Sequence, residues 1–235
     1  MEILPNLYQV DKVIANTFLL IDPDGLILID VGLPRSTPKI LHTITSLGYS
    51  ADDLKAVLLT HSDSDHVGSL AAIQAKSSAQ TCAHQIEAEA IQIGRLSRPL
   101  KLSGWKKWLY NLSTRFFRIT PGRVDKILQG EEVLPYWGGL QVIETPGHTP
   151  GHMSFFSPAK GILFCGDSLR CSTDVIRISR GANTWDESRA LTSAQKQAAL
   201  NPQVVCAGHG PVIFDAVHKF SLPRSQKDAE EISVL

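Results

Sequence analysis

The sequence lacks the features that mark membrane-spanning, secreted and strongly charged proteins. No uninterrupted apolar run approaches the roughly 18 residues that a membrane-spanning helix needs. The N-terminal stretch 1–5 has neither a basic region nor an apolar core, so it does not look like a secretory signal. Lys and Arg total 23, and Asp and Glu also total 23, so the overall charge gives no reason to expect a nucleic acid as a partner. These absences predict a soluble protein.

Cysteine is also scarce, and its spacing excludes the common metal and redox motifs. Cys82, Cys165, Cys171 and Cys206 are scattered, and no two of them form a Cys-x-x-Cys pair. Cys165 and Cys206 fall inside apolar runs, where a free thiol packs as a small hydrophobic group. We therefore expect free cysteines and a reducing, cytoplasmic location.

What is present predicts one globular domain. The chain has 235 residues, of which 43% are hydrophobic and 20% are charged, which is enough for a substantial core. Residues 7–31 are typical of an antiparallel meander, with a Pro-Asp-Gly turn at 23–25. Helices are expected over 36–47, after His66, over 85–93 and over 185–200, and further strands over 56–60, 80–83, 139–144, 154–156, 161–165 and 203–206.

One segment differs in composition from the rest of the chain. Between Arg95 and Arg123 there are eight basic residues and no acidic one, interleaved with aromatic residues that include Trp105 and Trp108. We expect residues 94–124 to form a helical insertion. It would serve as an amphipathic element packed on the domain, as a lid over an apolar pocket with the two tryptophans facing substrate, or as a patch in peripheral contact with an anionic membrane. Stacking of nucleic-acid bases is a less common use of such a segment.

Metal-capable side chains cluster directly after the predicted strand at 56–60. His61, Asp63, Asp65 and His66 fall within six residues, and a tight turn after a strand brings such side chains toward one point. The alternative is a polar loop that opens a helix, with Ser64 or Asp65 as its N-cap.

Three later strands repeat this pattern and favour the metal-site interpretation. Each short apolar strand runs into a glycine and then into a histidine or an aspartate: His148, Asp167 and His209. Glycine allows a sharp turn and a close approach of the backbone. Binding and catalytic sites often form where several strands end at one edge of packed sheets, so we expect these turns to lie close together.

The whole pattern resembles the metallo-β-lactamase-fold hydrolases, whose signature is His-x-His-x-Asp-His. The resemblance covers nearly the whole chain and implies an α/β (α+β) fold, a four-layer αββα sandwich with a two-metal site at one edge. It implies that one metal is held by His61, Asp63 and His148, the other by Asp65, His66 and His209, and that Asp167 bridges them. His152 matches a recurring position that is not a ligand, so we expect it to support the site or the substrate pocket.

Asp63 departs from the family signature, which has histidine there. Its charged oxygen makes the first metal position harder, so zinc remains the expected metal while iron or manganese becomes suitable as well. Two cations about 3.5–4 Å apart would hold a bridging hydroxide and polarise the substrate, and Asp65 would orient the nucleophile or move its proton. The expected reaction is therefore hydrolysis.

The expected substrate is a small ester, lactone or thioester. The stretch 145–152 is similar to that of glyoxalase II and the acyl-homoserine-lactone lactonases. Glyoxalase II carries a C-terminal helical domain that binds glutathione, and only the segment 210–235 follows His209, which disfavours a glutathione thioester. The alternatives are a phosphodiesterase or nuclease on the same site, a mononuclear iron oxygenase of the persulfide dioxygenase type, and a non-enzymatic module with structural metals.

Overall fold

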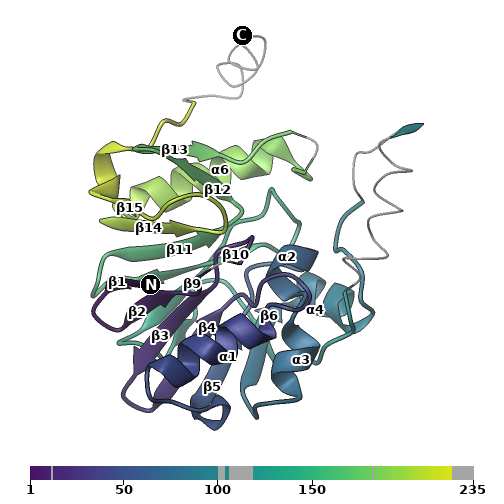
Figure 1. The fold of residues 1–235 in the computed structure, drawn as a ribbon. Coiled ribbons are helices and arrows are strands. Elements are labelled where there is room, and N and C mark those ends of the chain that lie inside the picture. The colour runs from purple at the N-terminus through teal and green to yellow at the C-terminus, as the bar shows by residue number, and fades with distance from the viewer. Residues whose placement is uncertain (12, 100–103, 106–118, 182, 224–235) are drawn as a thin grey trace.

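Two β-sheets lie face to face at the centre of the fold, with helices on their outer sides (Figure 1). The computed structural model describes residues 1–11, 13–99, 104–105, 119–181 and 183–223. Within these residues, the strands of the first sheet are β1 (Glu2–Leu4), β2 (Leu7–Gln9), β3 (Phe18–Asp22), β4 (Gly25–Ile29), β5 (Leu54–Leu58), β6 (Gln80–His84) and β7 (Lys126–Leu128), hydrogen-bonded in that order.

The second sheet is built from the later part of the chain. Its strands are β8 (Val133–Leu134), β9 (Leu140–Glu144), β10 (Met153–Ser157), β11 (Ile162–Gly166), β14 (Val204–Ala207) and β15 (Ile213–Phe214), and they lie in the order β15-β14-β11-β10-β9-β8. A separate hairpin pairs β12 (Leu169–Ser172) with β13 (Val175–Ile178). The helices are α1 (Thr37–Ser46), α2 (Ser64–Val67), α3 (Leu70–Gln74), α4 (Gln85–Gln92) and α6 (Glu187–Ala199), with 3₁₀ turns η1 (Ala51–Asp53) and η2 (Ala216–His218).

The side chains of the central strands pack alternately on two sides, which fixes the layers. In β4, Ile27 and Ile29 face the core between the sheets, whereas Leu26 and Leu28 face the outer core beneath the helices. The core between the sheets includes Phe18, Phe155 and Phe164, and a third core lies between the second sheet and α6. The expected four-layer αββα architecture is confirmed.

The early part of the chain follows the sequence prediction closely. β2, β3 and β4 pair antiparallel as expected, and the turn between β3 and β4 places Gly25 at φ 141°, a backbone conformation that glycine readily adopts. The single helix expected after His66 is instead two short helices, because the chain breaks at Gly68 and Ser69. A Cβ at Gly68 would collide with Pro34, and the Ser69 hydroxyl donates to Leu33 O at 2.6 Å and accepts from Ser36 N at 2.8 Å.

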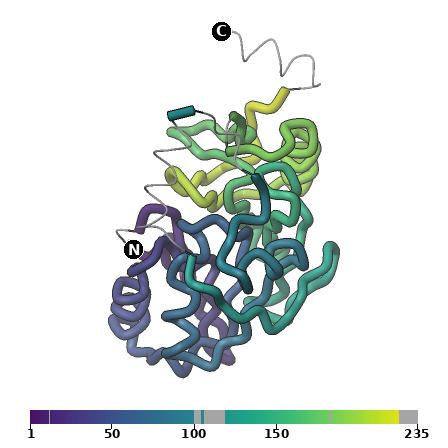
Figure 2. The backbone as a smooth tube through the Cα atoms, turned by 90° about the vertical axis from the view of Figure 1, so that its right-hand side faces the viewer, coloured from purple at the N-terminus to yellow at the C-terminus, as the bar shows by residue number. Residues whose placement is uncertain are grey.

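The strand directions bring four turns to one edge. β9 and β11 both run antiparallel to β10, and β14 is parallel to β11, so the C-terminal ends of β9, β11 and β14 lie at the same edge. Met153 N, at the start of β10, donates to Thr60 O at 2.8 Å and ties this edge to the end of β5. Figure 2 shows the earlier part of the chain, coloured purple to blue, packed against the later part, coloured green to yellow.

Two predictions extend beyond what the structure describes. Most of the insertion expected over 94–124 lies outside the described residues, so its helical character stays a prediction. Within the part of the chain that is described, no helix has the length and apolar content that a membrane span requires.

Candidate metal centre

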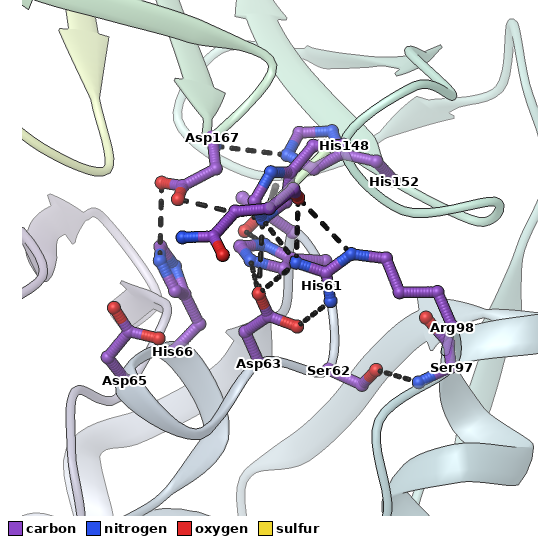
Figure 3. A network of polar contacts seen from close by, with 12 residues as sticks. His61, Ser62, Asp63, Asp65, His66, Ser97, Arg98, His148, His152 and Asp167 are labelled. Carbon is purple, nitrogen blue, oxygen red and sulfur yellow. Dashed lines mark hydrogen bonds and ion pairs between the residues drawn. The ribbon is translucent and has the colours of Figure 1, made fainter. Parts of the chain in front are cut away.

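Every side chain that the sequence placed in a metal centre lies at the seam between the two sheets. Figure 3 shows His61, Asp63, Asp65 and His66, from the turn after β5 and from α2, facing His148 and Asp167. The turn after β9 supplies His148, the end of β11 supplies Asp167, and the turn after β14 supplies His209. The structure therefore brings all seven expected residues together.

One half of the site is formed by Asp65, His66, His209 and Asp167. The Nε2 atom of His66 lies 3.3 Å from Asp167 Oδ1, and the Nε2 atom of His209 lies 3.2 Å from Asp65 Oδ2 and 3.4 Å from Asp167 Oδ2. His66 Nε2 and Asp167 Oδ1 are buried and have no hydrogen-bond partner among the described residues. The ligand atoms of Asp65, His66 and His209 lie within 4.8 Å of one another, and those of His61, His66 and Asp167 do so as well, as the ligands of one cation do.

The other half is formed by His61, Asp63 and His148. The Oδ2 atom of Asp63 lies 3.6 Å from His61 Nε2 and 3.1 Å from His148 Nε2. The Nε2 atom of His61 is buried without a hydrogen-bond partner in the described residues. These three donors could converge on a second cation, but a fourth side chain already lies among them.

That side chain is Arg98, which the sequence reasoning missed. Its guanidinium donates from Nη1 to Asp63 Oδ1 at 2.7 Å and from Nη2 to Asp63 Oδ2 at 2.8 Å, and Nη2 lies 3.3 Å from His148 Nε2. The Arg98 side chain is only 2% exposed. The excess of basic residues after Arg95 was the available signal, and Asp63 is the partner that gives one of them a place in the site.

Asp30, at the end of β4, orients the cluster from behind. Its Oδ2 accepts a hydrogen bond of 2.7 Å from His66 Nδ1, and its carboxylate also accepts from the backbone and the hydroxyl of Thr60, each at 2.8 Å. Thr60 Oγ1 in turn lies 2.9 Å from His61 Nδ1. A carboxylate behind a histidine fixes which ring nitrogen faces a metal. The sequence marked Asp30 only as the end of the meander.

His152 supports the turn that presents Asp167. Its Nε2 accepts from the backbone N–H of Asp167 at 3.1 Å, and its Nδ1 lies 2.8 Å from the Thr145 hydroxyl. Burial, together with the positive charge of neighbouring histidines, holds the pKa of His152 well below its ordinary value, so the ring is neutral and able to accept. This position fits the supporting role expected of His152.

Glu87 is a second side chain that the sequence reasoning missed. It is fully buried on α4 and accepts hydrogen bonds from Ser62 N at 2.9 Å and from Ser97 Oγ and Gly151 N at 3.0 Å each. One carboxylate thus joins the turn after β5, the start of the basic segment 95–123 and the turn that carries His148. Its helical environment gave no sequence signal for this role.

The electrostatics of the cluster favour a bound cation. Hydrogen bonds to Asp167 and Asp65 raise the pKa of His209 to about 9. Burial opposes the charged form of His66, but the carboxylates of Asp167 and Asp30 outweigh it and raise its pKa well above the ordinary value. Burial likewise opposes ionisation of Asp167, yet the neighbouring histidines hold its pKa well below the ordinary range. Without a metal, protons supply the positive charge that these carboxylates require.

The two halves differ in how well they fit a divalent metal. One half offers oxygen and nitrogen donors that suit zinc, iron or manganese, from Asp65, His66, His209 and Asp167. A Cβ on Gly208 would collide with Asp167 and His66, so the absent side chain keeps this position open. In the other half, both oxygens of Asp63 are already bound by a cationic group, which does not fit a metal at that position.

A pocket of about 410 Å³ opens on the cluster. It is lined by Asp63, Asp65, His148, Asp167, Leu169, Arg170, Ser179, Arg180, Asn183 and His209. Trp105 is 69% exposed, and Trp108 lies outside the described residues, so their expected place in the substrate pocket stays a prediction.

Comparison with known proteins agrees with this geometry. A family model described as the metallo-beta-lactamase superfamily matches residues 10–209. The chain belongs to this superfamily. A solved superfamily structure, a metallo-beta-lactamase family protein from Thermus thermophilus, is 25% identical, superposes with a TM-score of 0.76, and matches over 99% of this chain and 81% of its own. The resemblance inferred from the motifs is confirmed, and so is its fold.

Two curated superfamily relatives have names that describe hydrolases. The probable metallo-hydrolase YflN of Bacillus subtilis (strain 168) is 28% identical over 215 residues, which cover 84% of this chain and 81% of that protein. A hydroxyacylglutathione hydrolase of Fuscovulum blasticum is 28% identical over 182 residues, which cover 76% of this chain and 56% of that enzyme. The expected class of enzyme, a metallo-hydrolase, is confirmed at this level, and the superfamily implies divalent metal ions.

Proposed function

We propose that this metallo-hydrolase cleaves an ester, lactone or thioester bond in a small molecule that carries an anionic group. The observation that carries the proposal is that Asp65, Asp167 and His209 line one pocket, and that the buried His66 Nε2, which has no hydrogen-bond partner among the described residues, lies 3.3 Å from Asp167 Oδ1. Such a set suits a cation that remains open to substrate on one side.

The roles of the residues follow from their positions. Asp65, His66, His209 and Asp167 would hold the cation, for which zinc, iron and manganese are all suitable. A bound cation of this kind lowers the pKa of water and polarises the carbonyl oxygen of a substrate. Asp65 lines the pocket and lies 3.2 Å from His209, so its carboxylate is placed to orient an attacking water and to accept its proton.

The pocket wall supports the anionic part of the proposal. Arg170 and Arg180 line the pocket together with the polar residues Ser179 and Asn183. Guanidinium groups bind carboxylates and phosphates through paired hydrogen bonds. An acyl compound with a carboxylate or phosphate head would place its reacting carbonyl at the cation and its head at these arginines. The same wall would also suit a phosphodiester, which is the second candidate substrate.

Hydrolysis by metal-depleted and reloaded protein tests the proposal. The panel holds a lactone, a thioester, a carboxylic ester and a phosphodiester, each with and without a carboxylate group. Asp167→Asn is compared with Asp174→Asn, whose wild-type side chain is exposed and pairs with Lys219 away from the site.

We expect hydrolysis of an acyl substrate that is lost on metal depletion and in Asp167→Asn but kept in Asp174→Asn. Hydrolysis of the phosphodiester alone would overturn the acyl substrate and identify the protein as a phosphodiesterase, the second candidate. Oxygen consumption with a persulfide, without hydrolysis of any member of the panel, would overturn the proposal in favour of an oxygenase.

A further inference from the structure

Arg98 contacts Asp63 and His148, two of the three residues that the family resemblance assigns to one of the two cations. Both guanidinium Nη atoms bind the Asp63 carboxylate end-on, at 2.7 and 2.8 Å, and the side chain is 2% exposed. Figure 3 shows this guanidinium lying between Asp63 and the imidazoles of His61 and His148. A buried, bidentate arginine of this kind has a fixed place, because its planar fork matches the carboxylate.

The donors of Arg98 are almost fully used, which fixes the state of its neighbours. Nε and the second hydrogen of Nη2 reach the backbone oxygen of Asn183, at 3.3 and 2.9 Å. Nη2 therefore has no hydrogen left for His148, although the two atoms lie 3.3 Å apart. His148 Nε2 instead donates to Asp63 Oδ2, at 3.1 Å.

A divalent cation among these residues would meet two obstacles. It would have to displace the guanidinium from both oxygens of Asp63, and it would then lie close to the Arg98 charge in a buried site. In the other half of the centre a cation would displace protons but no side chain, because His66 Nε2 and Asp167 Oδ1 have no hydrogen-bond partner within the described residues.

We infer that this chain binds one metal ion, at Asp65, His66, His209 and Asp167, and that the Arg98 guanidinium replaces the other. The inference rests on the proposed metal-dependent function and narrows it. Asp63 is then the partner of Arg98 rather than a metal ligand. Arg98 is a positioning residue: it neutralises Asp63 and holds His148 through that carboxylate.

The test is the number of metal ions per chain, measured by native mass spectrometry and elemental analysis after loading with excess Zn²⁺ and removal of free metal. We expect one ion in the wild type. Arg98→Met should bind a second ion, since it frees Asp63. The matched control is Arg95→Met, because Arg95 is an exposed arginine of the same segment, and it should keep one ion.

A second pair of variants locates the ion. His209→Ala should lose the single metal, whereas His148→Ala should keep it. The double variant Arg98→Met, Asp63→His removes the buried carboxylate together with its partner, and it should bind two ions even where Arg98→Met alone fails to fold.

The outcomes separate the inference from the function on which it rests. Two ions in the wild type, or a single ion that depends on His148 and not on His209, would overturn the inference and leave metal-dependent hydrolysis intact. A second ion absent from both Arg98 variants in folded protein would also overturn it. No bound metal, or hydrolysis unaffected by metal depletion, would overturn the proposed function itself.

Discussion

The Asp30 carboxylate accepts a hydrogen bond of 2.7 Å from His66 Nδ1, linking the end of β4 to the histidine of α2. Because the bond occupies Nδ1 as a donor, Nε2 is left as the atom that faces the metal position. The same carboxylate holds the backbone and hydroxyl of Thr60. The Asp30 side chain thus holds together the C-terminal ends of the neighbouring strands β4 and β5.

Replacing Asp30 should weaken metal binding without removing a ligand. Asp30→Asn keeps the shape but loses the negative charge and one acceptor, so we expect metal affinity to fall about 10- to 100-fold. Competition with a chromophoric chelator measures this change. Asp24→Asn, in the exposed turn between β3 and β4, is the control and should bind metal as the wild type does. Equal affinity in the two variants would show that Asp30 does not orient His66.

Glu87 should contribute mainly to stability. In Glu87→Gln, an amide N–H₂ group must face one of the donors that the buried carboxylate now accepts, from Ser62, Ser97 and Gly151. A buried donor left without an acceptor costs about 1–3 kcal/mol of the free energy of unfolding. Denaturant titration measures the loss. Glu89→Gln, at an exposed position on the same helix, should change the midpoint little, and an equal shift in both would contradict the role of Glu87.

The two arginines that line the pocket should favour the hydrolysis of anionic substrates over neutral ones. We expect Arg170→Ala and Arg180→Ala each to lower kcat/KM for an anionic acyl substrate about fivefold, as for the loss of about 1 kcal/mol from a partly exposed ion pair. Neutral analogues should be hydrolysed at unchanged rates. Arg189→Ala, on the exposed side of α6 beside Asp186, is the control. Equal losses for charged and neutral substrates would remove the case for an anionic group.

The cysteines should be inert in the folded protein. All four are free, as expected, and all four are buried, which the sequence predicted for Cys165 and Cys206. Burial raises the pKa of both Cys82 and Cys171 to about 12. At pH 8 this lowers the reactive thiolate fraction about a thousandfold relative to an ordinary thiol. A disulfide reagent should therefore report no free thiol at pH 8 until denaturant is added, when all four react. Rapid labelling of native protein would contradict this burial.

The same shifts give a pH dependence of stability with a definite sign. Folding favours the protonated thiols, so their contribution is complete below the unfolded-state pKa of about 8.5 and declines as the pH rises above it. The denaturation midpoint should fall in the alkaline range, and alanine at Cys82 should reduce that slope.

The sequence predicted the fold and the metal-capable residues well because both depend on local signals. Each apolar strand that runs into a glycine and then into a histidine or an aspartate can be recognised from a few consecutive residues. The strands β7 and β12 were missed because they have only 3 and 4 residues, so even the alternation of Leu169 and Cys171 with exposed Arg170 and Ser172 in β12 is too short to stand out. Their hydrogen bonds to neighbouring strands decide their conformation.

The supporting residues of the site could not be predicted for a related reason. Arg98 and Asp63 are 35 positions apart, and Asp30 and His66 are 36 apart, so only the tertiary fold brings them together. Nothing in the composition of the basic segment distinguishes Arg98 from its seven basic neighbours. The motif reveals the position of Asp63 but not its partner Arg98, so the sequence alone predicts a metal ligand at Asp63.

The pairing of Arg98 with Asp63 also constrains how this site changes in evolution. Asp63→His alone would leave a buried guanidinium beside two imidazoles with no counter-charge, and Arg98→Met alone would leave a buried carboxylate without its partner. Each single step is thus costly, while the two together cost less than their sum. Across related chains, aspartate at this motif position and arginine in the insertion should therefore be gained and lost together, and their joint presence would mark the members that work with one metal.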